Sequence, residues 1–327
     1  MRCEPALEVR VDVVVGRPAA LLPRKDLTVG RKSDTMRPMC WRIVILALWW
    51  CSAVSAAEVP VVATIYPVAD IVAQIGKDAV GVTTLLPAGA SPHTFEPTPD
   101  QIRSLAQAAL FVEIGAGLDT WAERIRAARS GSMKVVTLTT GLPLLGAAHV
   151  HAGEGEGGDP HVWLDPVIVR DHFVPAITAA LSEIDPGHHA LFQQNAAELR
   201  AALTQLDTDI RAALAAAANR NYVAFHTAWR YFGQRYGLHE VAVIEAFPGK
   251  EPSAREVAGV VEQARAAKVR VMLVEPQFSP RMAEQIAHEI GATTAVVDPL
   301  GNPQQPGRDH YIDLMRYNLQ QFARALR

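Results

Sequence analysis

The sequence predicts an α/β protein of two lobes, each a four-stranded parallel sheet with flanking helices, joined by one long rigid helix. The chain has 327 residues, 49% of them hydrophobic, which favours two domains with ample core. Short apolar runs alternate with helical segments in the first half and again in the second half, as a parallel sheet requires. Between the halves lies a stretch, 185–220, that neither glycine nor proline interrupts after Gly187.

Residues 1–57 are expected to be an upstream extension plus a signal peptide that is removed. The stretch MRPMCWRIVILALWWCSAVSAAEVP, residues 36–60, has a basic start, an apolar run and then small residues, which is typical of a secretory signal. The apolar run is too short for a transmembrane helix. Bulky tryptophans precede Cys51 and do not suit a lipoprotein cleavage site. We therefore expect a soluble periplasmic protein without a lipid anchor.

Export changes the cysteine count and the charge. All three cysteines precede residue 58, so the mature chain has neither a disulfide nor a thiolate ligand. The first 56 residues hold nine of the 31 basic and five of the 34 acidic residues, which leaves 22 basic and 29 acidic residues in the mature part. An acidic exported protein is a poor candidate for nucleic-acid binding. This charge is compatible with a cation as ligand.

The first lobe, residues 58–184, is predicted from four apolar runs and the helices between them. A helix follows the first run, and Gly76 is expected to stop it. The next helix begins at Thr98, because Thr98 and Gln101 have the spacing of a capping box. A third helix is expected around 121–129. The four predicted strands are VPVVATI (59–65), GVTTLLP (81–87), AALFVEIG (108–115) and MKVVTL (133–138).

The second lobe, residues 221–327, repeats this alternation. Ser253 and Glu256 have the spacing of another capping box. Gly291 is expected to close the helix that begins at Ser279. The predicted strands are NYVAF (221–225), EVAVIEA (240–246), KVRVMLVE (268–275) and TTAVVD (293–298), and the predicted helices are 227–236 and those that begin at Ser253, Ser279 and Tyr311.

The linking helix is predicted over residues 185–220. Asp185 is expected to cap it and Pro186 to occupy its first turn. A helix of this length would run roughly 45–50 Å, enough to span both lobes and leave a cleft at the strand ends, where open sheets bind ligands. Its expected buried face is Leu191, Leu199, Leu203, Leu206, Ile210 and Leu214, which recur at steps of three and four or multiples of these.

Four polar residues follow predicted strands in loops that can face this cleft. His93 lies in a loop stiffened by prolines, His161 in the stretch DPHVWLDP, His226 directly after NYVAF, and Asp298 at the end of TTAVVD. Three imidazoles and one carboxylate match a tetrahedral divalent site, and zinc accepts both ligand types. The histidines outside such loops are expected to be ordinary surface or core residues: His172, His188, His189, His239, His288 and His310.

Seven stretches resemble the zinc- and manganese-binding solute-binding proteins of bacterial ABC importers. The resemblance runs from about Val59 to the C-terminus and implies two α/β lobes joined by a rigid helix, with the metal buried between them. Residue by residue, it implies His93, His161, His226 and Asp298 as ligands, and an ABC membrane permease as partner of a monomer. The stretches are ATIYPVADIV, LLPAGASPHTFEPTPDQI, DPHVWLDP, FHTAWRYFGQRYGL, EPSAREV, EPQFSPRMAEQIAHEIGA and VVDPLG.

The expected cargo is Zn²⁺. Manganese-binding members of the resembled family generally place a glutamate where this chain has His226. Imidazole in place of a hard carboxylate favours borderline metals such as zinc. A homologue that binds manganese or iron is the alternative.

A glycine-rich loop before His161 carries further donors. His149, His151, Glu154 and Glu156 form a possible auxiliary metal site. The loop is either a low-affinity metal collector or a solvated connection, since composition alone decides little.

Two rival functions come from other classes. A metalloenzyme would keep an open coordination position and a general base. No HExxH motif occurs, and Glu96 and Glu245 are the possible bases. An adhesin would use the metal as a structural element. We expect a binding protein and not an enzyme, and only small rearrangements when metal binds, because the linking helix is stiff.

Overall fold

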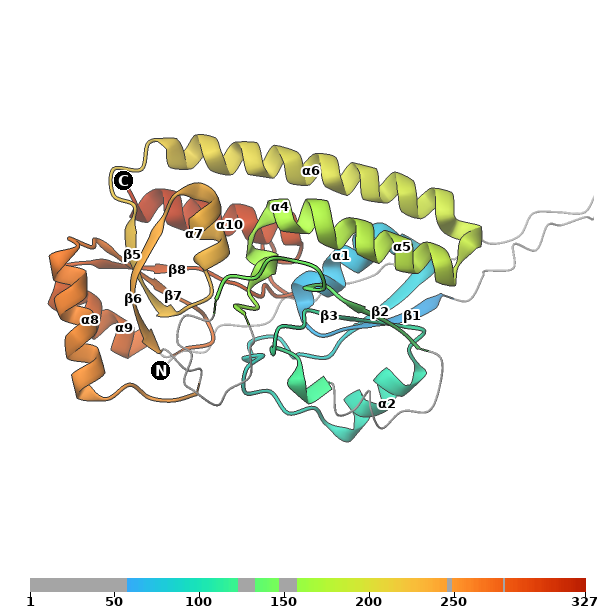
Figure 1. Ribbon diagram of the computed structural model, residues 1–327, viewed down its shortest axis with the longest axis horizontal. Helices are drawn as coiled ribbons and strands as arrows, with labels where there is room; N and C mark the ends of the chain where they lie inside the picture. The colour runs from blue at the N-terminus through green and yellow to red at the C-terminus, as the bar shows by residue number, and fades with distance from the viewer. Residues whose placement is uncertain (1–57, 123–132, 147–157, 246–248, 279) are drawn as a thin grey trace, which may run out of the picture. The chain divides into compact units, whose positions relative to one another are not determined.

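The structure is a computed structural model that describes residues 58–122, 133–146, 158–245, 249–278 and 280–327 (Figure 1). The predicted signal peptide and most of the helix expected around 121–129 lie outside these ranges. The described residues belong to one compact unit. None of the helices in the described ranges combines the length and the hydrophobicity needed to cross a membrane.

The first lobe is built on a four-stranded parallel sheet with the order β2-β1-β3-β4. Its central strand β1 is buried along most of its length, because helices cover both faces of a parallel sheet. The strands are β1 Val59–Ala63, β2 Val80–Thr84, β3 Leu110–Glu113 and β4 Lys134–Thr137, and the helices between them include α1 Tyr66–Gly76 and α2 Pro99–Gln107.

The second lobe repeats this topology in the order β6-β5-β7-β8. The predicted fold class of two four-stranded parallel sheets is therefore confirmed. The strands are β5 Asn221–His226, β6 His239–Glu245, β7 Val271–Val274 and β8 Thr293–Val296, and the helices are α7 Arg230–Tyr236, α8 Ala254–Ala266, α9 Pro280–Ile290 and α10 Tyr311–Ala325.

One long helix, α6 His189–Ala215, links the two sheets (Figure 1). It packs against α1 and α5 of the first lobe and against α10 and α7 of the second. Its 27 residues span about 40 Å. The predicted joint between the lobes is thus a single helix that contacts both of them.

Both ends of α6 differ from the prediction. A 3-10 turn, Pro186–His188, precedes it, and Asp185 makes no cap there but pairs with His188 Nδ1 at 2.6 Å. The helix ends at Ala215, where Arg220 Nη2 donates to the Leu214 carbonyl at 3.1 Å. The residues that follow turn towards β5 because they pair with the C-terminus of the chain, for example Ala218 N with Leu326 O at 3.1 Å.

The buried face of α6 begins one residue later than predicted. Leu191 is 36% exposed, whereas Phe192 is fully buried. From Leu199 to Leu214 the predicted apolar positions are buried. At 3.6 residues per turn, Leu191 lies about 80° from Leu199 around the helix and Phe192 only about 20°, so Phe192 lies on the buried stripe and Leu191 beside it.

Local capping signals were predicted correctly. Thr98 and Gln101 form a capping box at the start of α2, and Ser253 and Glu256 form one at the start of α8. Gly291 follows α9 with φ +70°, in the left-handed region that favours glycine. These signals depend on residues three or four apart and need no tertiary contact.

Gly76 has a different role from the one predicted. It is the last residue of α1, with φ −82°, and the residue with a positive φ at the helix end is Lys77, with φ 47°. A Cβ atom on Gly76 would lie 2.3 Å from Val80 Cγ2. Glycine is needed here because α1 approaches β2 closely, and not to end the helix.

A helical stretch before α6 was not predicted. Residues Pro166–Ile168 form α4, Val169–Phe173 a π-helical turn, and Val174–Ile184 form α5. Pro175 lies inside this stretch, and a proline normally argues against a helix interior. The π-helical turn just before Pro175 accommodates the ring, since such a turn shifts the hydrogen-bond pattern.

A continuous hydrophobic core extends through both lobes under α6. It includes Ile71 of α1, Leu203 of α6, Phe232 of α7 and Phe322 of α10, all fully buried. The Phe232 and Phe322 rings stack with centroids 4.8 Å apart. One hydrophobic cluster therefore spans both lobes, and each lobe also has a smaller cluster of its own.

Candidate metal centre

The three predicted histidines follow strand ends in both lobes. His93 lies in the loop after β2, His161 directly before the 3-10 turn Val162–Leu164, and His226 is the last residue of β5. The His93 loop is fixed at its two ends, because Gln101 Nε2 at the start of α2 donates to the Leu85 carbonyl at 2.6 Å. Rigid elements therefore present these rings.

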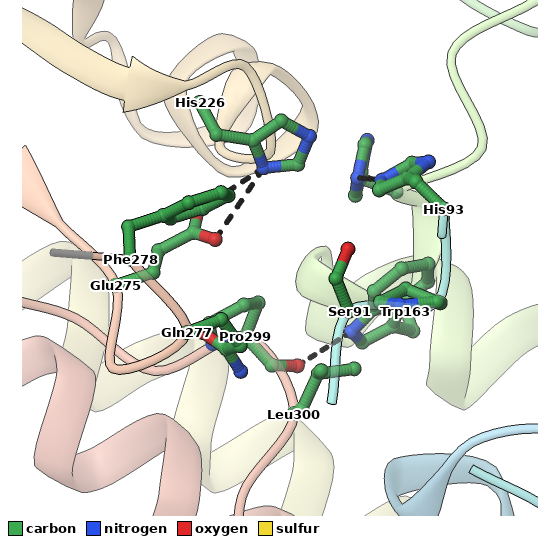
Figure 2. Close-up of a pocket in the computed structure, with 11 residues that line it drawn as sticks. Ser91, His93, Trp163, His226, Glu275, Gln277, Phe278, Pro299 and Leu300 are labelled. Atoms are coloured by element: carbon green, nitrogen blue, oxygen red, sulfur yellow. Dashed lines mark hydrogen bonds and ion pairs between the residues drawn. The ribbon is translucent and has the colours of Figure 1, made fainter. Parts of the chain in front are cut away.

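The structure brings the three imidazoles together, and Figure 2 labels two of them, His93 and His226, at one pocket. Their ring centroids lie 5.2 Å (His93–His161), 5.0 Å (His93–His226) and 4.9 Å (His161–His226) apart. His93 Nε2 lies 3.2 Å from His161 Nε2. One donor atom from each ring falls within 4.8 Å of the others, and in the described ranges this is the single group of three or more such side chains.

The spacing fits a tetrahedral ion. Two imidazole nitrogens at about 2.0–2.1 Å from zinc lie about 3.3 Å from each other, close to the 3.2 Å between His93 Nε2 and His161 Nε2. His161 and His226 are 4% and 5% exposed. Three imidazoles that face one another are unusual in an ordinary core, where polar groups pair with donors or acceptors of the opposite kind.

Two of the histidines are held by buried carboxylates. His161 Nδ1–H donates to Asp159 Oδ1 at 2.8 Å. His226 Nδ1 lies 3.4 Å from both oxygens of Glu275, as Figure 2 shows. A carboxylate on Nδ1 fixes the tautomer that presents Nε2 to a metal. The two rings are therefore oriented for coordination before an ion arrives.

Electrostatics also suit a cation. Burial, together with the other two imidazoles, holds the pKa of His93 well below its usual range, so this ring stays neutral and keeps its lone pair. Burial lowers the pKa of His226, but the Glu275 carboxylate more than offsets this and raises it overall. Positive charge is thus disfavoured at His93 in the absence of metal and favoured beside Glu275.

Asp298 does not join the histidines. Its Oδ2 forms an ion pair with Arg308 Nη1 at 2.9 Å, and its Oδ1 accepts from the backbone N–H groups of Leu300 and Gly301 at 3.0 and 2.9 Å. Here the structure differs from the expectation of a fourth ligand. The carboxylate instead stabilises the turn after β8, because Arg308 and two amides already occupy its oxygens.

The pocket around the rings is lined by both lobes. Trp163 of the first lobe donates its indole N–H to the Pro299 carbonyl of the second lobe at 2.7 Å (Figure 2). Phe278 packs against His226 with ring centroids 5.7 Å apart. Ser91, Gln277 and Leu300 complete much of the remaining wall. Apolar walls around a cation site strengthen its electrostatic interactions with the ligands.

The other predicted donors lie elsewhere. His149, His151, Glu154 and Glu156 fall in 147–157, outside the residues that the structure describes. Of the two possible bases, Glu96 is exposed, and Glu245 is buried and accepts from the Gly249 N–H. Neither belongs to the group of metal-binding side chains.

Asp159 and Glu275 were not predicted as partners of the ligands. Asp159 stands two residues before His161 in the stretch DPH. This short separation could have indicated that the Asp159 carboxylate reaches the His161 ring. Glu275 follows β7, which pairs with β5, the strand that carries His226. That neighbourhood depends on strand order, which the sequence alone does not fix.

Comparisons with known proteins agree with this geometry. Residues 61–325 match the family model described as zinc-uptake complex component A, periplasmic. The chain is similar to the high-affinity zinc uptake system protein ZnuA of Bacillus subtilis, with 32% identity over 271 residues that cover 79% of this chain and 85% of that protein.

Two further similarities extend the comparison. The zinc-binding protein AdcA of Streptococcus pyogenes is 30% identical over 285 residues, which cover 80% of this chain but only 55% of AdcA. A crystal structure of ZnuA superposes with a TM-score of 0.73 at 30% identity, covering 83% of this chain and all of that one.

Proposed function

Because this chain belongs to the family of periplasmic zinc-uptake component A, we propose that it captures Zn²⁺ outside the cytoplasm and delivers it to an ABC-type membrane permease. Its relatives are named as zinc-uptake and zinc-binding proteins. The family is a solute-binding transport component, which supports a binding role for this chain. Zinc is its cargo.

The observation that carries the proposal is the convergence of His93, His161 and His226. Two of these ligands come from the first lobe and one from the second. An ion bound by all three therefore links the lobes. Neutral imidazoles are good ligands for zinc, and the carboxylates of Asp159 and Glu275 increase the basicity of two of them.

Release follows from the same division of ligands. If docking to the permease moves the second lobe by a small amount, His226 leaves the coordination shell, and the first lobe retains only two ligands. A two-imidazole site holds zinc far more weakly than a three-imidazole site. Small displacements of the lobes are thus enough to switch between capture and release.

We further propose that the mature protein is a soluble monomer of residues 58–327 without a lipid anchor. Its parts are the lobe 58–184, the linking segment 185–220 and the lobe 221–327. The intact mass of the exported protein and its elution volume on gel filtration test this. A lipid-modified N-terminus or a dimer would contradict it.

The direct test of the function is metal content and competitive zinc titration of residues 58–327. We expect one tightly bound zinc per chain, and a loss of affinity for His161→Ala at least as large as the roughly 10–100-fold that follows removal of an outer partner of a ligand. His288→Ala should cause no change, since His288 is exposed on α9. His226→Glu should weaken zinc and improve manganese relative to zinc. Equal zinc binding by wild type and His161→Ala would overturn the proposal.

A further inference from the structure

Asp159 connects a first-lobe ligand to the second lobe. Its Oδ1 accepts from the backbone N–H of His161 at 3.0 Å and from the His161 ring at 2.8 Å. Its Oδ2 lies 3.5 Å from Arg230 Nη1, at the start of α7 in the second lobe. The buried Asp159 carboxylate therefore contacts both the ligand His161 and the Arg230 guanidinium of the opposite lobe.

The neighbouring tyrosine holds the same segment. Tyr231 OH donates to the Asp159 carbonyl at 2.8 Å and accepts from Leu145 N–H at 2.9 Å. Arg230 Nη1 also donates to the Gly146 carbonyl at 2.6 Å. The first turn of α7 thus binds the chain on both sides of the segment 147–157, directly before His161.

These contacts join the two lobes close to the metal centre. Arg230 and Tyr231 follow His226 by only four and five residues. A displacement of α7 relative to the first lobe therefore changes the place of His226 and, through Asp159, the orientation of the His161 ring. The residues that hold Asp159 can act on both sides of the coordination shell.

A purely stabilising role accounts poorly for this arrangement. The Arg230 side chain is 27% exposed and its Nη1 lies 3.5 Å from Asp159 Oδ2, and partly solvated ion pairs of this kind stabilise a fold only weakly. The same α7 already has a shorter cross-lobe ion pair, Arg235 with Asp165 at 2.8 Å. What distinguishes Arg230 and Tyr231 from Arg235 is their contact with the partner of a ligand.

We propose that Arg230 and Tyr231 are positioning residues for His161, and that they determine how fast zinc leaves the site. The inference rests on the proposed function. Loss of the Arg230 guanidinium removes a contact of the Asp159 carboxylate, and loss of the Tyr231 hydroxyl removes one of the Asp159 backbone carbonyl. The His161 ring is then held less firmly, and its bond to zinc opens more often. Zinc association depends on access to the pocket and changes little.

The test compares matched pairs on one helix. Arg230→Gln and Tyr231→Phe remove the proposed contacts. Arg235→Gln and Tyr236→Phe are the controls, because they remove a cross-lobe ion pair with Asp165 and a hydrogen bond to Asp207, neither of which touches a ligand or its partner. The readout is zinc dissociation into excess chelator, measured by stopped flow on zinc-loaded residues 58–327.

Zinc should dissociate about tenfold faster from Arg230→Gln and Tyr231→Phe, as expected when an outer partner of a ligand is lost. The controls should stay within about twofold of wild type, and Arg230→Lys, which keeps the charge, should recover part of the effect. Dissociation rates equal to those of the controls would overturn the inference. Thermal unfolding of all variants confirms that each is folded.

A second measurement separates this inference from the proposed function. In zinc-free protein, the His161 Nδ1–H proton should be observable by NMR in wild type, because Asp159 accepts it, and should exchange faster with water in Tyr231→Phe. Failure of wild type to retain zinc would contradict the proposed function while this signal still tests the positioning. An unchanged exchange rate in Tyr231→Phe would contradict the inference itself.

Discussion

The three histidines of the metal centre are supported in different ways. His161 and His226 each have a buried carboxylate on Nδ1, at 2.8 and 3.4 Å. His93 is held by its loop, in which prolines restrict the backbone. A preorganised ligand loses less entropy when it binds an ion. The carboxylates therefore preorganise His161 and His226 through their side chains, and the prolines preorganise His93 through its main chain.

At Asp298 we expect a structural effect and little change in metal binding. Asp298→Asn removes the charge that pairs with Arg308, which is 14% exposed in its side chain, and should lower the free energy of unfolding by about 1–3 kcal/mol. The zinc dissociation constant should change by less than about threefold, because the Asp298 carboxylate pairs with Arg308 and lies outside the group of three histidines. Competitive titration measures this.

His161→Ala, which removes a ligand, is the comparison for that titration. If Asp298→Asn weakened zinc as much as His161→Ala, Asp298 would have to leave Arg308 and enter the coordination shell when zinc binds. That outcome would restore the ligand set expected from the sequence.

Asp119 gives a pH dependence of stability that is separate from the metal centre. It follows β3, and its Oδ2 accepts from Gly115 N–H at 2.8 Å. Burial raises its pKa to about 7. Between about pH 4 and pH 7 the folded chain keeps this proton while the unfolded chain loses it, so the free energy of unfolding falls as pH rises through this window.

Asp119→Asn should remove that contribution. The variant should gain stability relative to wild type as pH rises from 5 to about 7, by at most about 1.4 kcal/mol for each pH step of one, and the gain should level off above pH 7. Urea denaturation of zinc-free protein at pH 5, 6, 7 and 8 measures it. A constant difference between the two proteins at all four pH values would show that Asp119 titrates normally.

The residues of the metal centre were predictable where the adjacent sequence indicates their position in the fold. His93, His161 and His226 were singled out because each follows a strand end, and strand ends gather in an open α/β sheet. Glu275 was missed because its distance to His226 depends on the pairing of β5 with β7. Asp298 was expected beside the histidines, but in the structure its carboxylate pairs with Arg308, ten residues away.

At the scale of helices and strands, some features depend on local sequence signals and others on tertiary contacts. The capping boxes at Thr98 and Ser253 formed as predicted. The long helix ended early because Arg220 binds its last turn from outside. The helical stretch Pro166–Ile184 was missed because Pro175 lies within it. The capping boxes were thus reliable local signals, whereas the cap expected at Asp185 did not form.

Gly76 offers a test of close packing between a helix and a strand. Gly76→Ala places a methyl group 2.3 Å from Val80 Cγ2, and overpacking of this kind costs about 1–3 kcal/mol. In an open helix position the same change stabilises by about 0.5–1 kcal/mol. We therefore expect a lower free energy of unfolding, measured by urea denaturation.

Gly259→Ala is the matched control for this change. Gly259 lies in α8, and a Cβ there would meet nothing within 4 Å, so this variant should be stabilised. The double variant Gly76→Ala/Val80→Ala should recover part of the loss. If Gly76→Ala were stabilising, α1 and β2 would be free to separate at this point.

At the scale of the whole molecule, buried contacts tie the lobes together. Trp163 donates to Pro299 at 2.7 Å, and Asp70 of α1 accepts from the first N–H of α10, that of Tyr311, at 2.7 Å. The sequence repeat predicted two lobes, but these contacts depend on how the lobes meet and were not predictable. They limit how far the lobes can move apart.

We therefore expect a small conformational change on metal binding. A compact chain of this size has a radius of gyration of about 18 Å, and zinc should change it by less than about 1 Å. Small-angle scattering of residues 58–327 with and without zinc measures this. A larger compaction would mean that the shared core under α6 opens in the zinc-free protein.

The most direct test of the account is the position of the ion itself. Crystals of zinc-loaded residues 58–327, measured on both sides of the zinc absorption edge, should show one strong anomalous peak at about 2.0–2.1 Å from a nitrogen of each of His93, His161 and His226. Asp298 should remain paired with Arg308. A peak elsewhere, or one bound by Asp298 without all three histidines, would contradict the account.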